Sequence, residues 1–197
     1  EIVSAAIAGG VDVVQLREKD LSVRERYEMG RQLRKLTREA GVTFVVNDRA
    51  DLAAVLDADG VHLGDDDLPV RAARRLLGED TVVGRSVSTV AEAKAAEKHT
   101  ADYLGVGTVY RTNSKDDIPE ETHGVGPERV GAISDAVDIP IVGIGGITAE
   151  NADEVARAGA DGVAVITAIT QAEDPEAATA ALGGAVTRGK RGRTDDG

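Results

Sequence analysis

The run VDVVQLREKD at residues 11–20 begins like a buried strand and ends in an amide, two cations and a carboxylate with no hydrophobic cover. Arginine offers paired N–H donors to an anion, and lysine offers a compact positive charge. Ligands of parallel α/β proteins bind at the carboxyl ends of strands. The positions of Arg17 and Lys19 therefore predict a binding site for a polyanion.

Other polar residues would complete this anion pocket. Lys115 and the hydroxyls of Thr112 and Ser114 follow another strand-like run. Asp48 and Asp67 follow two further strand-like runs. Carboxylates beside so many cations are best explained if they hold a hard divalent ion that is shared with a phosphate. The competing interpretation is that these side chains simply face water. Their gathering at strand ends favours a site.

A second anion site is predicted from the sequence GIGGI at residues 143–147. Glycines let backbone N–H groups approach an anion, and Thr167 lies where a short helix would begin after the last strand. Loops after the last two strands form the phosphate site of many (β/α)8 barrels. A tight turn would also explain the glycines. Taken with the first pocket, the pattern indicates two phosphorylated substrates.

The elements that would position these residues are seven short hydrophobic runs. Four of them follow an aspartate, at Asp12, Asp59, Asp102 and Asp161, and each aspartate follows an Ala-rich helical stretch. Short strands without clean alternation, each separated by a helix, are typical of a parallel sheet covered on its outer faces. The seven predicted strands lie within residues 10–16, 43–47, 58–64, 81–86, 101–107, 139–146 and 160–166.

Helix boundaries can be placed in two of the intervening stretches. Ser22 and Glu25 form a capping-box pattern, and Gly41 predicts the end of that helix. Thr148 is expected to open a later helix, with Gly159 at its carboxyl end. The two candidate architectures for the chain are a doubly wound sheet and a (β/α)8 barrel.

The count of strands favours a (β/α)8 TIM barrel that lacks its first strand. If the four Asp-headed strands are strands 2, 4, 6 and 8 of a barrel, the three runs between them are strands 3, 5 and 7. No hydrophobic run then remains for strand 1. We therefore expect a single, N-terminally truncated barrel domain over residues 1–187. Residues 188–197, RGKRGRTDDG, contain no apolar residue and are expected to form a disordered tail.

Composition argues against several classes of function. A formal net charge of −12 disfavours a nucleic-acid or anionic-membrane partner, because both would be repelled. The sequence has no cysteine and no long apolar run, so we expect a cytoplasmic protein. The acidic, Lys-poor composition suggests adaptation to high salt, and lower stability in concentrated KCl than in dilute buffer would contradict this. The oligomeric state stays open, a homo-oligomer included.

The histidines contribute little to the prediction. His62 lies within a strand-like run, His99 near a helix end and His123 in a loop. None has the spacing of a metal site, so structural or solvent roles are expected. No Ser/His/Asp arrangement for nucleophilic catalysis is evident.

Six motifs carry a resemblance to a known family: VVQLREKD, VNDRADLA, GVHLGDDDLP, GTVYRTNSK, IPIVGIGGI and VAVITAITQAEDP. In this order they resemble thiamine phosphate synthase, over residues 1–184. The resemblance implies a (β/α)8 barrel that joins hydroxymethylpyrimidine diphosphate to a thiazole phosphate with Mg2+ as cofactor. The products would be thiamine phosphate and pyrophosphate.

The resemblance also implies roles for individual residues. Asp48 and Asp67 would hold Mg2+, and Ser86 and Lys115 would steady the leaving pyrophosphate. The catalytic residues would be Arg17, Lys19, Ser86 and Lys115. The pyrimidine diphosphate would be bound by Gln15, Arg17, Lys19 and Asn47. The thiazole phosphate would be bound by Thr112, Ser114, Gly146, Ile166 and Thr167.

The chain departs from the family pattern in the loop that follows residue 106. Thr108 and Arg111 stand where prolines are usual, which leaves the loop less constrained before binding. Two alternatives stay open. A related thiazole tautomerase uses the same barrel without a diphosphate site, and retention of Arg17, Lys19 and Asp48 argues against it. An inactive phosphate-binding barrel is the other.

Overall fold

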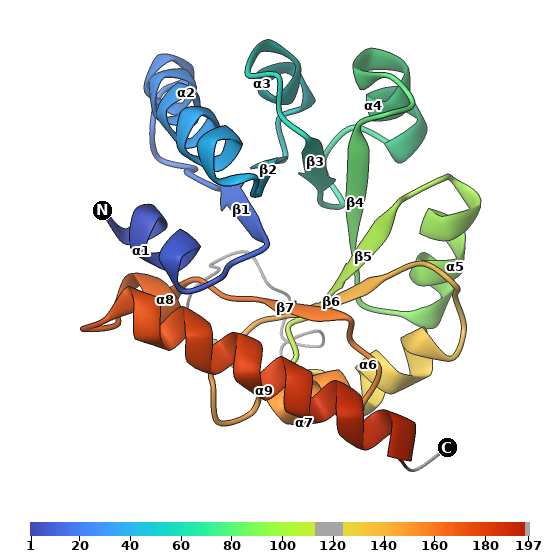
Figure 1. Ribbon diagram of the computed structural model, residues 1–197. Helices are drawn as coiled ribbons and strands as arrows, with labels where there is room; N and C mark the ends of the chain where they lie inside the picture. The colour runs from blue at the N-terminus through green and yellow to red at the C-terminus, as the bar shows by residue number, and fades with distance from the viewer. Residues whose placement is uncertain (113–123, 196–197) are drawn as a thin grey trace.

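The computed structural model describes residues 1–112 and 124–195. In these residues, seven strands form one parallel sheet whose order follows the chain. The sheet curves into an open ring with the helices outside it (Figure 1). The elements are α1 (Ile2–Ala8), β1 (Val13–Leu16), α2 (Val23–Ala40), β2 (Thr43–Asn47), α3 (Ala50–Val55), β3 (Gly60–Leu63), α4 (Val70–Leu77), β4 (Val82–Val87), α5 (Val90–Lys98), β5 (Tyr103–Val106), α6 (Pro127–Ser134), β6 (Ile141–Ile144), α7 (Ala152–Arg157), β7 (Gly162–Ala164), α8 (Thr167–Thr170) and α9 (Pro175–Asp195).

The sheet confirms the predicted TIM-barrel-like α/β fold. Each of the seven predicted runs overlaps one strand, and sequential strands pair in parallel, as Val14 of β1 does with Phe44 of β2. Among the described residues, β1 and β7 each have one strand neighbour and form the two edges of the sheet. The ring is therefore open between β1 and β7 (Figure 1).

Helix α2 begins and ends where the sequence predicts. Glu25 N donates to Ser22 Oγ (3.3 Å), and Ser22 N donates to Glu25 Oε2 (2.9 Å), which completes the capping box. Gly41 ends the helix in the left-handed conformation, with φ of 68°. Helix α7 instead starts at Ala152, later than predicted, because the turn that contains Thr148 precedes it.

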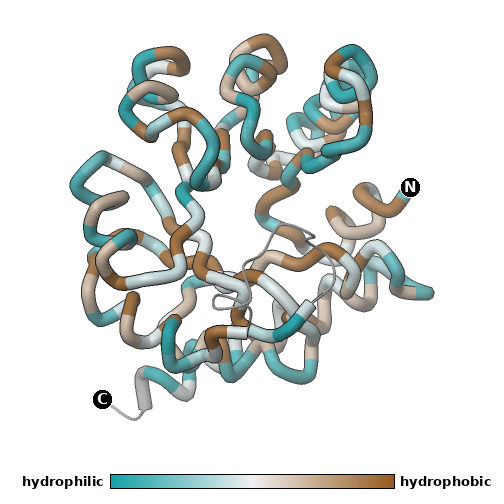
Figure 2. The backbone as a smooth tube through the Cα atoms, turned by 180° about the vertical axis from the view of Figure 1, so that it is seen from behind, coloured by the Kyte–Doolittle hydropathy of each residue, from teal (hydrophilic) through white to brown (hydrophobic). Residues whose placement is uncertain are grey.

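The core lies between the outer face of the sheet and the helices. Fully buried side chains there include Phe44, Leu63 and Ile133, and Figure 2 shows hydrophobic strand segments inside a more hydrophilic ring of helices. Although the run at residues 11–20 begins like a buried strand, Val13 is 47% exposed, because it alternates onto the concave side of an edge strand. No helix in the described part of the chain is long and apolar enough to cross a membrane.

Three of the recurring aspartates tie neighbouring strands together at their amino ends. Each carboxylate accepts a hydrogen bond from a backbone N–H of the preceding strand and forms an ion pair with an arginine of a helix. We call these arrangements the Asp brackets. They are Asp59 with Phe44 N (2.8 Å) and Arg34 (2.7 Å), Asp102 with Val83 N (2.6 Å) and Arg74 (2.6 Å), and Asp161 with Ile141 N (3.0 Å) and Arg193 (3.8 Å).

The C-terminal segment differs from the disordered tail predicted from residue 188. Helix α9 continues to Asp195 and packs along α7 (Figure 1). Gly189 lies so close to α7 that a side chain there would collide with the Asp153 carbonyl oxygen and the Ala156 side chain. Here glycine permits close approach of two helices, and Arg193 reaches an Asp bracket. The charged, glycine-rich composition therefore has a packing explanation.

Candidate active site

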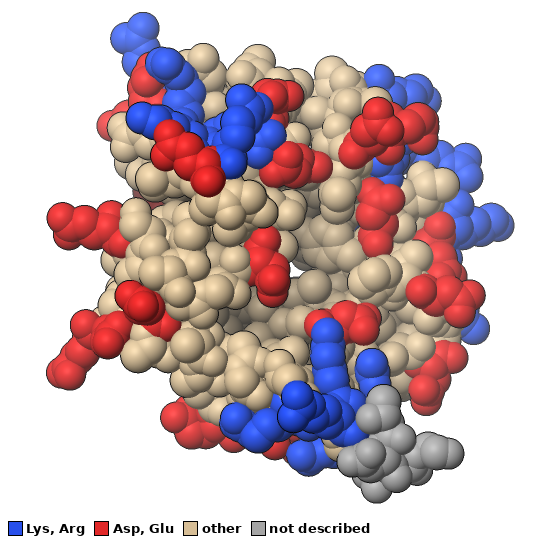
Figure 3. Space-filling view, in the orientation of Figure 1, with Lys and Arg blue, Asp and Glu red and all other residues tan. Residues whose placement is uncertain are grey.

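The predicted site residues that the structure describes lie at one edge of the sheet, where the carboxyl ends of the parallel strands meet. Seen from the side of α1 and α9, which is the face opposite to these strand ends, the molecule is hollowed at its centre (Figure 3). Gln15, Arg17 and Lys19 come from the end of β1 and the loop after it, Asn47 and Asp48 from β2 and its loop, Asp67 from the loop after β3, Ser86 from β4, Thr112 from the loop after β5, Gly146 from the loop after β6, and Ile166 and Thr167 from the segment after β7. Ser114 and Lys115 lie outside the described residues.

Asp48 and Asp67 form the electrostatic centre of this edge. Burial raises the pKa of Asp48, and the neighbouring carboxylate of Asp67 raises it further, whereas Lys19 and Arg17 lower it. Gly64 N holds Asp67 in place by donating to its Oδ2 (2.6 Å). The fold thus holds two carboxylates together, which is unfavourable unless a cation or a shared proton lies between them.

The donor set of this pair fits a hard divalent cation. Carboxylate oxygens are the protein ligands that Mg2+ prefers, and Mg2+ usually keeps several waters beside one or two carboxylates and substrate phosphates. No group of three or more His, Cys, Asp or Glu side chains placed to hold a metal occurs in the described segments. Among the described residues, Asp48 and Asp67 are the carboxylates that could hold Mg2+ here, together with oxygens from a substrate and from water.

Ser86 is held by a network that sequence reasoning missed. His62 Nε2 lies 2.9 Å from Ser86 Oγ, and His62 Nδ1 lies 2.9 Å from the Tyr103 hydroxyl. Burial raises the pKa of Tyr103, so this hydroxyl stays protonated. Gly105 leaves room for the imidazole, because a Cβ there would come within 2.8 Å of it. The three side chains come from β3, β4 and β5, so no local spacing could have indicated the network.

The loop after β5 lies directly on the loop after β6. Tyr110 N donates to Gly145 O (3.0 Å), and a Cβ on Gly146 would come within 2.8 Å of Arg111 O. Gly145 and Gly146 also have positive φ values of 102° and 63°, which favour glycine. Close packing and backbone conformation together explain both glycines. The same packing brings the segment that leads to Thr112 against the predicted phosphate-binding loop.

The side chain of Tyr110 fixes this loop to α7. Its hydroxyl donates to Glu154 Oε2 (2.7 Å), and burial together with this hydrogen bond raises the pKa of Tyr110. The sequence contains no signal for the contact, because residues 110 and 154 belong to different βα units.

The last predicted element of the site is the short helix after the final strand. Helix α8 begins at Thr167, where the sequence predicts it, and Ile166 occupies the N-cap position. Ile166 is 36% exposed.

Comparison with known proteins gives concordant matches. The model of the family described as thiamine monophosphate synthase matches residues 1–169. The chain is 66% identical to the thiamine-phosphate synthase of Haloarcula marismortui, over 96% of this chain and 90% of the relative. It is 63% identical to that of Haloquadratum walsbyi, over 94% and 83%. The solved structure of thiamine phosphate pyrophosphorylase from Pyrococcus furiosus superposes with a TM-score of 0.87 at 42% identity, over 95% of this chain and 89% of that chain.

Proposed function

The chain belongs to the thiamine monophosphate synthase family, and we propose that the carboxyl ends of its strands perform that family's reaction. Thiamine-phosphate synthase activity follows from the identity to the curated relatives. In the proposed reaction, hydroxymethylpyrimidine diphosphate loses pyrophosphate, and the ring nitrogen of the thiazole phosphate forms a bond to the pyrimidine methylene carbon. The products are thiamine phosphate and pyrophosphate.

The chemistry requires charge stabilisation more than a nucleophile. We propose that the bond between the methylene carbon and the diphosphate oxygen breaks first, and that both bonding electrons leave with pyrophosphate. The protein then needs cations at the leaving group and a fixed position for the thiazole nitrogen. Arg17, Lys19 and Lys115 supply the positive charge. Gln15 and Asn47 orient the pyrimidine, and the Ser86 hydroxyl, positioned by His62, donates a hydrogen bond to pyrophosphate.

The pair formed by Asp48 and Asp67 is the observation that carries the proposal. Two carboxylates held together beside Arg17 and Lys19 support a diphosphate site that is completed by a divalent cation. In this proposal Asp48 and Asp67 hold Mg2+. When bound, Mg2+ supplies positive charge to the diphosphate oxygens.

The thiazole phosphate is assigned to the opposite side of the ring. Gly146 follows β6, and Ile166 and Thr167 follow β7, so backbone N–H groups and the hydroxyl of Thr167 come from neighbouring strand ends on this side. Thr112 follows the loop that packs on Gly146, which supports its assignment to this side, and the family resemblance implies the same role for Ser114. The two sites would hold the reactants across the hollow of the ring.

The test is a reaction of the purified chain with both substrates, followed by pyrophosphate release and thiamine phosphate formation. We expect equimolar products with Mg2+ and loss of both when EDTA removes it. A tautomerase would release no pyrophosphate and would be indifferent to EDTA. An inactive phosphate-binding barrel would bind pyrophosphate but form no thiamine phosphate. Either of these outcomes would overturn the proposal.

A further inference from the structure

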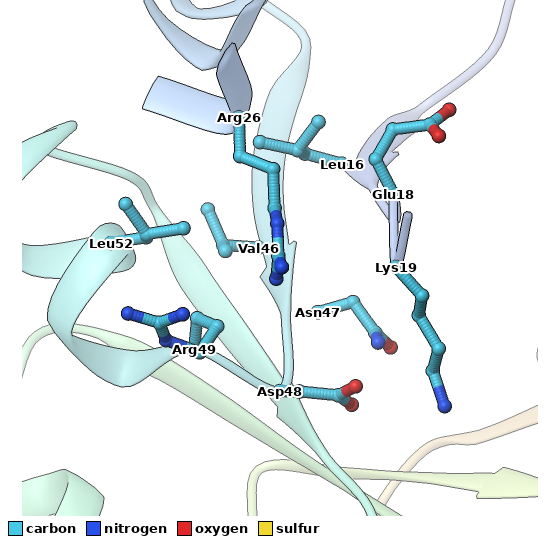
Figure 4. A pocket seen from close by; sticks show the side chains of 9 residues that line it. All are labelled: Leu16, Glu18, Lys19, Arg26, Val46, Asn47, Asp48, Arg49 and Leu52. Carbon is cyan, nitrogen blue, oxygen red and sulfur yellow. The ribbon is translucent and has the colours of Figure 1, made fainter. Parts of the chain in front are cut away.

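A small pocket opens next to the proposed diphosphate site, on the outer side of the sheet. It lies between the first turns of α2 and α3 and the carboxyl ends of β1 and β2 (Figure 4). Leu16, Val46 and Leu52 form its apolar walls, and Lys19 and Asp48 lie at its mouth. The pocket is therefore continuous with the proposed site. Its lining residues belong to the motifs VVQLREKD and VNDRADLA, except for Arg26, which lies outside them.

Arg26 extends from α2 into this pocket, between Leu52 and Asn47 (Figure 4). Its Nε donates to Leu21 O (2.8 Å), which fixes the direction of the guanidinium group. Within the described residues, the two terminal nitrogens of Arg26 have no hydrogen-bond partner and no carboxylate in salt-bridge range. A half-buried guanidinium group that is fixed at one end thus presents its unused donors to the pocket.

The other cations around the pocket differ in how they are used. Arg49 also lines the pocket, but it is already paired with Asp51, whose oxygens accept from Arg49 Nε (2.7 Å) and from a terminal nitrogen (2.5 Å). Lys19 lies at the mouth, where it lowers the pKa of Asp48. Of these three cations, Arg26 is the one whose terminal donors face the pocket without an anion. A partly buried cation of this kind is stabilised by an anionic ligand.

We propose that this pocket binds a phosphoryl group, with Arg26 donating two parallel hydrogen bonds to its oxygens. The planar fork of arginine matches two oxygens of a tetrahedral phosphate. The pocket is too small to enclose a whole anion, so the phosphoryl oxygens would reach Arg26 from the mouth beside Lys19 and Asp48. The phosphoryl group comes either from the terminal phosphate of a diphosphate at the neighbouring site or from free inorganic phosphate. The first source rests on the proposed function, and the second does not.

The test is a calorimetric titration at constant ionic strength with MgCl2, using pyrophosphate and inorganic phosphate as separate probes. Arg26→Gln removes the guanidinium group, and Arg24→Gln is the matched control, because Arg24 is exposed on the same turn of α2 and does not line the pocket. We expect Arg26→Gln to weaken binding about tenfold, the effect of losing a charge-assisted hydrogen-bonding partner. Arg24→Gln should bind as the parent does.

The two probes distinguish the sources of the phosphoryl group. Weaker binding of pyrophosphate alone assigns the pocket to the terminal phosphate of a diphosphate. Weaker binding of both probes assigns it to free phosphate as well. Unchanged affinity of Arg26→Gln for both probes, or a parent protein that binds neither, overturns the inference.

A second variant covers the case in which Arg26→Gln unfolds. Arg26→Lys keeps the charge but not the fork, and we expect about threefold weaker pyrophosphate binding. Parent-like binding by this variant would also overturn the inference. The proposed function is judged separately by product formation. If Arg26→Gln forms thiamine phosphate at the parent rate and binds pyrophosphate as tightly as the parent, only the phosphoryl subsite is wrong.

Discussion

Aspartates at the two ends of the strands have opposite surroundings. At the amino ends, each Asp bracket gives a carboxylate a backbone N–H and an arginine, and the pKa of Asp59 is lowered although burial alone would raise it. At the carboxyl ends, Asp48 faces Asp67, and its pKa is raised. Aspartates at the amino ends are therefore stabilised as anions by their partners, whereas Asp48 at the carboxyl ends is destabilised as an anion by a second carboxylate.

This difference indicates a division of labour within the ring. Satisfied carboxylates contribute to folding stability, whereas two carboxylates held together reduce it and persist where a ligand compensates. Stability is expected to depend on the amino ends and activity on the carboxyl ends, as in other (β/α)8 enzymes. Substitutions at each end can test this separation.

The largest effect is expected for Asp102→Ala. Arg74 is only 8% exposed, and it would lose its carboxylate partner while Val83 N loses its acceptor. We expect the free energy of unfolding to fall by about 3 kcal/mol in urea titrations. The kcat/KM of the protein that remains folded should stay unchanged. Asp80→Ala, at an exposed position, is the control, and a large loss of activity in folded Asp102→Ala would break the comparison.

Asp48→Ala should show the reverse pattern. We expect kcat/KM for the pyrimidine diphosphate to fall about 100-fold, because the variant lacks the carboxylate that is proposed to hold Mg2+ at the diphosphate. The free energy of unfolding should change little, because the relieved repulsion from Asp67 offsets the strain of an alanine at a φ of 64°. Steady-state kinetics and urea unfolding of this variant can be compared with exposed Asp66→Ala. A parent-like rate for Asp48→Ala would contradict both this comparison and the synthase assignment of the residue.

The pH dependence of the free energy of unfolding of Asp59→Asn should show whether an Asp bracket stabilises the fold. The pKa of Asp59 is lower in the folded than in the unfolded protein, so its contribution exists above the unfolded pKa of about 3.9 and is lost as pH falls through the folded pKa. We expect Asp59→Asn to cost about 1 kcal/mol at pH 7, a modest value because Asp59 is 38% exposed.

In urea titrations, the difference between parent and Asp59→Asn should begin to shrink below about pH 4, where the unfolded carboxyl becomes protonated. It should be lost once the pH passes the lower pKa of the folded protein. Asp57→Asn, at an exposed position paired with Arg38, is the matched control and should show little effect at either pH. A difference that grows toward acid pH would mean that Asp59 is destabilising as an anion.

The smallest effect is expected for Tyr110→Phe. Loss of the hydrogen bond to Glu154 loosens the loop that leads to Thr112, so the KM for the thiazole phosphate should rise about threefold. The KM for the pyrimidine diphosphate should not change. Tyr27→Phe on α2 is the control. An equal rise in both KM values would mean that the loop serves the whole site and not one side of it.

Local patterns predicted most of the fold. The capping box at Ser22 and the left-handed Gly41 define α2 from residues that lie close in sequence, and the Asp-headed runs located four strands. The prediction of disorder for residues 188–195 was wrong, because a charged sequence with several glycines is typical of a disordered segment when its packing partners are unknown. Only the contact of Gly189 with the α7 backbone shows why glycine is needed there.

In the candidate site, too, some features could be predicted from local patterns and others depend on contacts between strands. The fold brings Asp48 and Asp67 together, and motif order along the chain was sufficient to anticipate this. His62 was given a structural role, and its contact with Ser86 depends on the register of two neighbouring strands, which no spacing along one strand reveals. The roles of the site residues in binding Mg2+ and substrates stay predictions.

The Asp brackets have a consequence for how the molecule opens. They join β2 to β3, β4 to β5, and β6 to β7. Three pairs of strands therefore have a side-chain hydrogen bond in addition to those of the backbone. Hydrogen exchange is expected to proceed through these pairs as cooperative units, with the amides of Phe44, Val83 and Ile141 among the slowest. β1 follows Asp12, whose carboxylate has no such bond among the described residues, and this strand should exchange before the three pairs.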